Sequence, residues 1–229
     1  MRKGHPPNPP PSSFLNPPLR AGAIGGDAWV SNGGWMNGVD ACSWYGVTCA
    51  SSVITELQLK TNNLIGTLPT EFGLLTTLTK NVDLSANSFS QKLPTEIGAL
   101  TALTQNVRFC CGFSGPLPTV SRETPLGMIH DDFMRARRTS LFAPSPPLHH
   151  MIIPQELGRL TGMKFNLALN SNSFTGELPT TLFSVTELRG GLNLYSNQFS
   201  KTLPTQIGQL TKLTVNVNMY DAGFTGPLP

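Results

Sequence analysis

The chain has 229 residues, of which 13% are charged, and a formal net charge of +3 at neutral pH. This length is sufficient for one sizeable hydrophobic core, and so small a charge bias gives no reason to expect nucleic acid or an anionic membrane surface as a partner. No stretch has the length and apolarity of a membrane-spanning helix, so we expect no membrane span in this chain.

Residues 1–26 are rich in proline and contain no continuous apolar region. We expect a disordered N-terminal segment here, because a stretch of this composition offers little apolar surface to bury. An ordinary signal peptide needs an apolar region of roughly 7–15 residues, and none is visible.

Residues 27–52 form the next predicted unit. They contain all three tryptophans and two of the four cysteines: Trp29, Trp35, Trp44, Cys42 and Cys49. Three large rings in one short segment are suited to covering the open end of a core, which the first unit of a repeat protein requires. These rings have the bulk that a cap needs, and the family resemblance described below implies that the unit is one.

Beyond the cap the chain repeats. Six Leu-Pro steps and one Ile-Pro step share a register, and their prolines are Pro69, Pro94, Pro118, Pro154, Pro179, Pro204 and Pro229. The intervals between successive prolines are 25, 24, 36, 25, 25 and 25, so only one interval is broken. This period predicts a solenoid, with repeats over 53–118, an interruption over 119–152 and repeats over 153–229. Like coils form a binding surface without a built-in catalytic cleft, so we expect no enzyme, no cofactor and no metal site.

Each coil predicts a short strand, a turn and a return segment. In the second coil, Val82-Asp-Leu84 alternates with period two, which turns the apolar residues inward and Asp83 outward. Glycine and proline mark the turn. The following Ile97-Gly98-x-Leu100 segment predicts a short 3₁₀ return.

Asparagine recurs at two positions of the coil. The first set is Asn62, Asn87, Asn172 and Asn197, with Gly112 and Ala222 at the same position in two other coils. A side-chain amide there offers two donors and an acceptor, so stacked coils would form a buried ladder, interrupted at Gly112 and Ala222. The second set, which precedes the strands, is Asn81, Asn106, Asn166 and Asn216. It fits either a second polar row or a turn that accommodates one extra residue, and we favour the turn.

These residues closely resemble the plant-type leucine-rich repeat, Leu-x-x-Leu-x-Leu-x-x-Asn-x-Leu-x-Gly-x-Leu-Pro-x-x-Ile-Gly-x-Leu, over about residues 40–118 and 152–229. The resemblance implies an α/β solenoid: a right-handed superhelix with a parallel concave β-sheet and a convex side of short 3₁₀ and turn segments. The coil has about 25 residues here, against about 24 in the family, because the gap before each strand is one residue longer.

The segment Cys42-Ser-Trp-Tyr-Gly-Val-Thr-Cys49 looks like the N-terminal cap of such repeats, Cys-x-Trp-x-Gly-Val-x-Cys, with Ala41 where the family usually has proline. The resemblance implies a disulfide between Cys42 and Cys49, and therefore an oxidising compartment. We expect an extracellular or cell-surface protein. Because no signal peptide is visible, either the natural start lies upstream or export uses another route.

Residues 119–152 do not follow the template. The residues at the ladder position before and after this segment are Gly112 and Asn172. Their separation, 172 − 112 = 60 residues, equals two coils of 25 residues plus ten further residues. Three interpretations are open: a loop from one degenerate coil, which we favour; sequence that does not belong, such as retained non-coding sequence; and a functional island.

The outward-facing residues of the strands are the candidate ligand-binding residues. They are Lys60, Asp83, Ser85, Arg108, Asn170, Asn193, Tyr195, Asn218 and Tyr220. The N-terminal strands carry charge, whereas the C-terminal strands carry asparagine and tyrosine, a mixture suited to adaptable contacts. We expect Tyr195 and Tyr220 to be aromatic anchors.

The resemblance implies a non-catalytic recognition module that binds a protein, peptide or carbohydrate ligand on its concave face, of signalling or polygalacturonase-inhibitor type. One alternative is a fragment of a receptor-kinase ectodomain, since the sequence stops in mid-coil at Pro229. Another is an ice-binding or surface-adsorbing solenoid, with rows that include Thr79 and Thr104. The exposed apolar end of the last coil would permit self-association.

Overall fold

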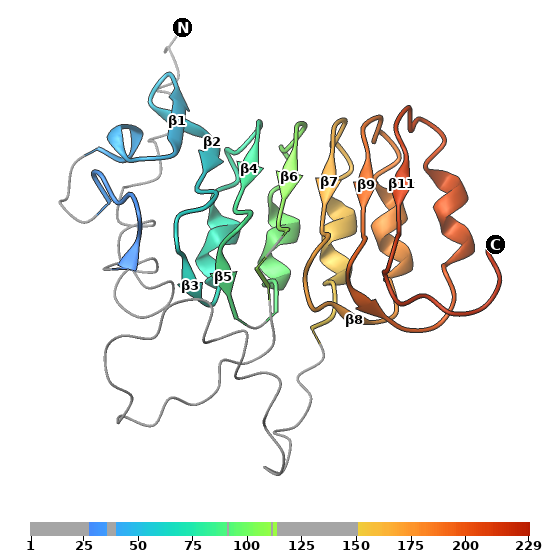
Figure 1. The fold of residues 1–229 in the computed structure, drawn as a ribbon. Coiled ribbons are helices and arrows are strands. Elements are labelled where there is room, and N and C mark those ends of the chain that lie inside the picture. Colours follow the sequence, from blue (N-terminus) through green and yellow to red (C-terminus); the bar gives the residue numbers. More distant parts are fainter. Residues whose placement is uncertain (1–27, 36–39, 91, 111, 114–150) are drawn as a thin grey trace, which may run out of the picture.

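The computed structural model describes residues 28–35, 40–90, 92–110, 112–113 and 151–229. The predicted N-terminal segment 1–26 and nearly all of the interruption, residues 119–150, lie outside these ranges. The described residues form a row of stacked coils, with strands side by side on one face and short helices on the other (Figure 1). The predicted solenoid architecture is thus present.

The strand face is a seven-stranded sheet in the order β1-β2-β4-β6-β7-β9-β11. Its members are β1 (Val47–Ala50), β2 (Val53–Gln58), β4 (Val82–Asp83), β6 (Val107–Arg108), β7 (Leu167–Ala168), β9 (Leu192–Asn193) and β11 (Val217–Asn218). All neighbours from β2 onward run parallel, whereas β1 and β2 are antiparallel. Each parallel pairing joins equivalent residues of successive coils, as a regular repeat requires.

Two smaller parallel sheets lie where the coils turn. One pairs β3 (Ile65–Gly66) with β5 (Ser88–Phe89), and the other pairs β8 (Thr175–Gly176) with β10 (Gln198–Phe199). In both, the residue after the ladder asparagine donates its backbone N–H to the preceding coil: Ser88 to the Leu64 carbonyl at 2.7 Å, and Gln198 to the Phe174 carbonyl at 2.8 Å. Each coil is therefore held to its neighbour by backbone hydrogen bonds at the turn as well as in the strands.

Short 3₁₀ helices form the opposite face. They are η4 (Thr70–Leu74), η5 (Thr95–Ala99), η6 (Gln155–Arg159), η7 (Thr180–Ser184) and η8 (Thr205–Gln209), and a proline precedes each. Their glycines let adjacent coils approach closely. A Cβ on Gly73 would lie 2.4 Å from the Glu96 carbonyl oxygen, and one on Gly98 would lie 2.6 Å from that of Glu156. Glycine is thus needed at this position of η4 and η5, whereas η7 accommodates Phe183 there.

The core consists of the inward leucines and a stack of phenylalanines. Phe89, Phe113, Phe174, Phe199 and Phe224 stack in that order, with ring centroids 4.9, 6.5, 6.5 and 5.2 Å apart. Each ring comes from a different coil, so the stack joins the second coil to the last. Such offset aromatic contacts add to the stabilisation from burial.

The cap closes the N-terminal end of this core. Trp29, Trp35 and Trp44 are buried and pack together, with centroids 5.1 Å apart for the first pair and 4.7 Å for the second. Trp35 donates from Nε1 to the Tyr45 carbonyl at 2.8 Å, which satisfies the only polar group of its side chain. The cap also contains the 3₁₀ helix η3 (Ala41–Ser43), whose first turn is held by the Asp40 carboxylate.

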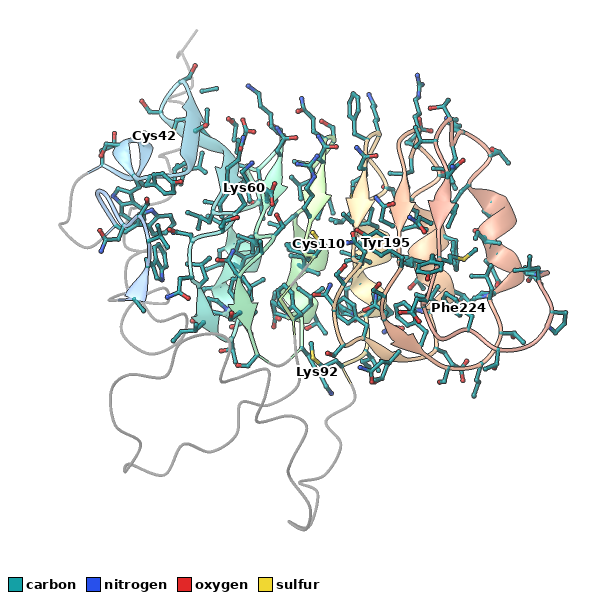
Figure 2. All side chains as sticks on the ribbon, viewed as in Figure 1. Cys42, Lys60, Lys92, Cys110, Tyr195 and Phe224 are labelled. Atoms are coloured by element: carbon teal, nitrogen blue, oxygen red, sulfur yellow. A yellow bond between two sulfur atoms is a disulfide. The ribbon has the colours of Figure 1, made fainter. Side chains whose placement is uncertain are left out.

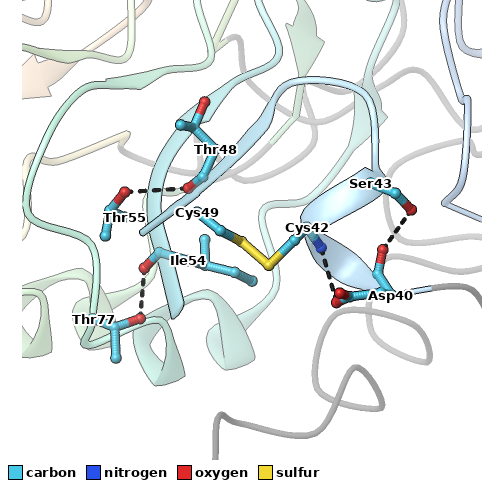
Figure 3. The surroundings of a disulfide bond; sticks show 8 residues. All are labelled: Asp40, Cys42, Ser43, Thr48, Cys49, Ile54, Thr55 and Thr77. Atoms are coloured by element: carbon cyan, nitrogen blue, oxygen red, sulfur yellow. Dashed lines mark hydrogen bonds between the residues drawn. A yellow bond between two sulfur atoms is a disulfide. The ribbon is translucent and has the colours of Figure 1, made fainter. Parts of the chain in front are cut away.

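The predicted disulfide is confirmed. Cys42 at η3 is bonded to Cys49 on β1 (Figure 3). In the same region, Thr77 donates to the Ile54 carbonyl at 2.7 Å and Thr55 to the Thr48 carbonyl. The Thr55 contact attaches the cap to β2, and the Thr77 contact attaches β2 to the first return segment.

Removing this disulfide is expected to lower the free energy of unfolding by about 2–3 kcal/mol, because it closes a short loop in the unfolded chain. The test compares urea unfolding of the wild type and of a Cys42→Ser, Cys49→Ser variant, each with and without reductant. Reductant should lower the midpoint of the wild type and leave that of the variant unchanged. Equal midpoints for the two proteins without reductant would show that the bond does not stabilise the cap.

The coil count across the interruption needs correction. β6 pairs directly with β7, with Val107 opposite Leu167 and Arg108 opposite Ala168, and η5 packs against η6. The two strands are hydrogen-bonded neighbours, so the count of two coils between the ladder positions Gly112 and Asn172 does not describe the sheet. The chain from β6 to β7 contains one coil and an insertion. The physical reason is that strand pairing, rather than chain length, decides which coils are neighbours.

Candidate functional site

The residues at the outward positions of the six parallel strands lie side by side, and we call this set the sheet strip, although Asp83, Ala168 and Asn170 are buried. It comprises two residues per strand: Gln58, Lys60, Asp83, Ser85, Arg108, Cys110, Ala168, Asn170, Asn193, Tyr195, Asn218 and Tyr220. In Figure 2, Lys60, Cys110 and Tyr195 mark it from β2 through β6 to β9. With parallel strands about 4.8 Å apart, the strip is roughly 25 Å long.

The N-terminal half of the sheet strip satisfies much of its own charge. Asp83, predicted to be displayed for a ligand, is only 5% exposed. Its carboxylate accepts from the Ser85 hydroxyl at 2.5 Å and pairs with the Arg108 guanidinium at 3.2 Å. Because Arg108 reaches from the next strand and covers it, Asp83 orients Arg108 and is not itself accessible. Lys60 remains exposed, as does nearly half of the Arg108 side chain.

The C-terminal half presents aromatic and amide groups. Asn170 is buried and donates to the Ser171 hydroxyl at 3.1 Å, so its predicted exposure is also wrong. Tyr220 is 81% exposed, and Tyr195 is half-buried at the same position of the neighbouring strand. Equivalent residues on neighbouring strands stand about 4.8 Å apart, so the two tyrosines form one aromatic patch. Asn193 and Asn218, half-buried and exposed, flank it.

The asparagines behind the strip hold it rigid. Asn87 accepts at Oδ1 from the backbone N–H groups of Asn62 and Leu64, both at 3.0 Å. Its Nδ2 donates to the carbonyls of Leu59 and Leu84, at 2.8 and 2.9 Å. One side chain thereby satisfies backbone groups of two coils.

Asn62, Asn172 and Asn197 make equivalent contacts. Asn172 and Asn197 each donate to a carbonyl of their own coil and to one of the preceding coil. Asn62 extends the ladder into the cap, where it both accepts from and donates to the Ser31 backbone. At Ala222, which has no amide, backbone carbonyls take over: Phe199 N–H donates to Ala222 at 2.9 Å.

Three asparagines of the second set, Asn81, Asn106 and Asn166, form a polar row. Asn106 donates from Nδ2 to Asn81 Oδ1 at 2.8 Å, and Asn166 donates in the same way to Asn106 at 2.9 Å. Glu56, which the sequence pattern did not single out, accepts from Asn81 at the start of the row. The interpretation that we favoured, a turn without a row, is therefore wrong. The signal was present in the regular spacing of these asparagines.

Titratable chemistry is sparse in this surface. The Lys212 ammonium donates to the Glu187 carboxylate and lowers the pKa of Glu187, away from the sheet strip. Within the described ranges, no three His, Cys, Asp or Glu side chains come together to hold a metal ion. No helix among the described residues is long and apolar enough to cross a membrane. The chemistry visible in the strip is therefore hydrogen bonding, aromatic contact and two cationic groups.

Two grooves lie away from the strip. One, of about 400 Å³, runs along η4, η5 and η6 and is lined by Glu96, Glu156 and Arg159 among others. The other, of about 590 Å³, includes Ile152 and Glu177. Neither contains a residue of the sheet strip.

Comparisons with solved structures agree with this architecture. The ectodomain of the receptor kinase SOBIR1 from Arabidopsis thaliana superposes with a TM-score of 0.54 and 21% identity, covering 82% of this chain and 87% of that one. The BIR3–SERK2 complex from the same plant gives 0.54 and 21%, covering 89% and 87%. The PEPR1–AtPEP1 structure gives 0.50 and 25%, covering 82% of this chain but 26% of that one. No protein-family model and no curated protein matches the chain. The fold is a leucine-rich repeat solenoid, like those of plant receptor ectodomains.

Proposed function

We propose that the chain is an extracellular recognition module that binds a protein or peptide on the sheet strip. The observation that carries this proposal is the pair of tyrosines on neighbouring strands, Tyr195 half-buried and Tyr220 exposed, whose backbone carbonyls accept from the Asn197 amide and the Ser196 N–H respectively. Rigid aromatic anchors supply contact area at low conformational cost. The likeness to the PEPR1–AtPEP1 structure supports a partner of this kind.

The charges of the strip indicate which ligand would fit. Asp83 is already paired, whereas Lys60 and part of the Arg108 side chain face solvent. A ligand with a carboxylate over β2 to β6 and an apolar or aromatic side chain over β9 to β11 complements both halves. An extended peptide that crosses the strands meets both requirements within roughly 25 Å.

Replacing Tyr195 and Tyr220 together with alanine is expected to weaken partner binding by about 30- to 900-fold, since truncating each interfacial tyrosine commonly costs ~1–2 kcal/mol. The matched control is Tyr45→Ala, which removes a tyrosine of the cap that is 47% exposed. Partners are recovered from an extracellular extract on immobilised wild type, control and double variant, and their affinities are then measured. Equal recovery on all three proteins would exclude the aromatic patch as the binding site.

A receptor-kinase ectodomain is the first alternative, because the ectodomain of the receptor kinase SOBIR1 shares this fold. Coding sequence downstream of Pro229 that contains a membrane span and kinase motifs would establish it. The ice-binding alternative has less support: the amides of Asn81 and Asn106 bond to each other and Thr104 donates to the Thr79 carbonyl, so these rows are internally satisfied. Purified protein without thermal hysteresis would exclude it.

Self-association through the last coil stays a proposal of the same kind. Val217, Met219 and Phe224 are only half-buried there, and Leu228 is 78% exposed. Exposed apolar surface of this kind favours association. Sedimentation over a range of protein concentrations tests it, and a monomer at every concentration would contradict it.

A further inference from the structure

The sequence around the 36-residue interval offers two segments for the same part of one coil: residues 113–119 and residues 151–155. In the structure, Phe113 joins the phenylalanine stack, and Met151 then contributes to the same coil: Ser173 donates to the Phe113 carbonyl at 3.0 Å, and Thr175 to that of Met151 at 2.9 Å. Ile153 and Pro154 then lead into η6. A second Leu-Pro step, Leu117-Pro118, follows shortly after Phe113 in the sequence.

Residues 113–119, which we call the upstream copy, match the other coils better than residues 151–155, the downstream copy that leads into η6 in the structure. After the stacked phenylalanine, coils read Phe89-Ser-Gln-Lys-Leu-Pro-Thr95, Phe174-Thr-Gly-Glu-Leu-Pro-Thr180 and Phe199-Ser-Lys-Thr-Leu-Pro-Thr205. The upstream copy reads Phe113-Ser-Gly-Pro-Leu-Pro-Thr119. It agrees with these coils at the Ser or Thr after the phenylalanine, at the Leu-Pro step and at the final threonine. The downstream copy reads Met151-Ile-Ile-Pro-Gln155 and lacks the threonine.

The backbone conformation of the other coils is an independent reason to regard the upstream copy as the better fit. The third residue of this segment has positive φ in four coils, at Gly66 (92°), Gly176 (79°), Lys201 (68°) and Gly226 (83°). Glycine adopts this conformation without strain, and Gly115 stands there in the upstream copy. Met151 stands there in the downstream copy. The next residue, Ile152, is a 44% exposed apolar side chain, where three other coils have Lys92, Glu177 and Thr202.

We infer that residues 120–155 are an in-frame insertion in a coil that is complete without them. The interval from Pro118 to Pro154 is 154 − 118 = 36, and the segment has the same length, 155 − 120 + 1 = 36, so removing it restores the register. The junction becomes Thr119-Glu156, which reproduces Thr70-Glu71 and Thr95-Glu96 at the starts of η4 and η5. The interval from Val107 to Leu167 would fall to 60 − 36 = 24, which suits strands of neighbouring coils.

The test compares two deletions of equal length with the full chain. Deleting residues 120–155 keeps the upstream copy, and deleting residues 114–149 keeps the downstream copy that occupies the coil in the structure. Both remove the same length of chain from one connection, so both relieve the same closure entropy. We expect the 120–155 deletion to have the highest Tm, a few degrees above the full chain and above the 114–149 deletion, because it also removes the Met151 and Ile152 mismatches.

Thermal unfolding followed by circular dichroism gives these Tm values. A 114–149 deletion that is as stable as the 120–155 deletion, or a 120–155 deletion that does not fold while the full chain does, would overturn the inference. The readout involves no ligand, so its failure would leave the recognition proposal standing. Conversely, undiminished binding by the Tyr195 and Tyr220 double variant would overturn the recognition proposal and would leave the inference about residues 120–155 unaffected.

Discussion

Replacing Asn87 with alanine is expected to lower the free energy of unfolding by about 3–5 kcal/mol, among the largest effects of a single substitution in this chain. Asn87 is buried, and its amide satisfies the N–H groups of Asn62 and Leu64 and the carbonyls of Leu59 and Leu84. Alanine leaves these backbone groups unpaired inside the solenoid, each at a cost of about 1–3 kcal/mol before relaxation or entry of water.

The matched control is Asn218→Ala, since Asn218 is exposed on β11 and its side chain accepts from the Tyr220 backbone N–H at 3.2 Å. It should cost less than about 1 kcal/mol. Asn87→Asp separates the two functions of the amide, because a carboxylate can still accept from Asn62 and Leu64 but cannot donate to the two carbonyls.

Urea unfolding of the wild type and the three variants measures these differences. Hydrogen exchange at the Leu64 amide locates the loss, because coils of a solenoid interact mainly with their nearest neighbours. If Asn87→Ala and Asn218→Ala proved equally stable, the ladder would have no special role in coil stacking.

Most features that the sequence predicted correctly depend on residues close together in the chain; the asparagine ladder, which joins successive coils, is an exception. The inward leucines follow from the period-two alternation, the 3₁₀ returns from the Ile-Gly segment, and the disulfide from the resemblance of residues 42–49 to a known cap. Each needs only residues that are close in the chain, so a single coil shows them and the repetition makes them clear.

Most of the failures involve contacts between coils. Asp83 was expected to be accessible because its strand position faces outward, but Arg108 of the next coil covers it. The asparagine row depends on whether Asn106 points toward Asn81, which spacing alone does not decide. The coil count failed because the length of chain between the two ladder positions fits either two coils and a short loop or one coil and a long insertion. Only the pairing of β6 with β7 distinguishes these.

Replacing Phe113 with alanine is expected to cost about 3–5 kcal/mol, because it removes a buried ring from the middle of the phenylalanine stack. Phe113 lies between Phe89 and Phe174 and meets Phe109 edge-on at 6.3 Å. The loss combines the transfer of apolar surface, a cavity that its neighbours fill only partly, and the aromatic contacts.

The position of Phe113 makes the result informative about the insertion. Phe113 belongs to the coil of β6 and stacks on Phe174 of the coil of β7. If the coils on either side of the insertion unfold together in the wild type, this ring therefore joins them. Phe113→Leu should recover much of the loss, because Leu64 fills the same position in the first coil and is fully buried there. Phe165→Ala, at a ring 52% exposed on the surface, is the control and should change stability by less than about 0.5 kcal/mol.

Urea unfolding followed by tryptophan fluorescence of the cap and by circular dichroism of the whole chain gives two midpoints. In Phe113→Ala they should separate, with the coils after β6 unfolding first, and coincident midpoints at wild-type values would contradict the joining role of Phe113.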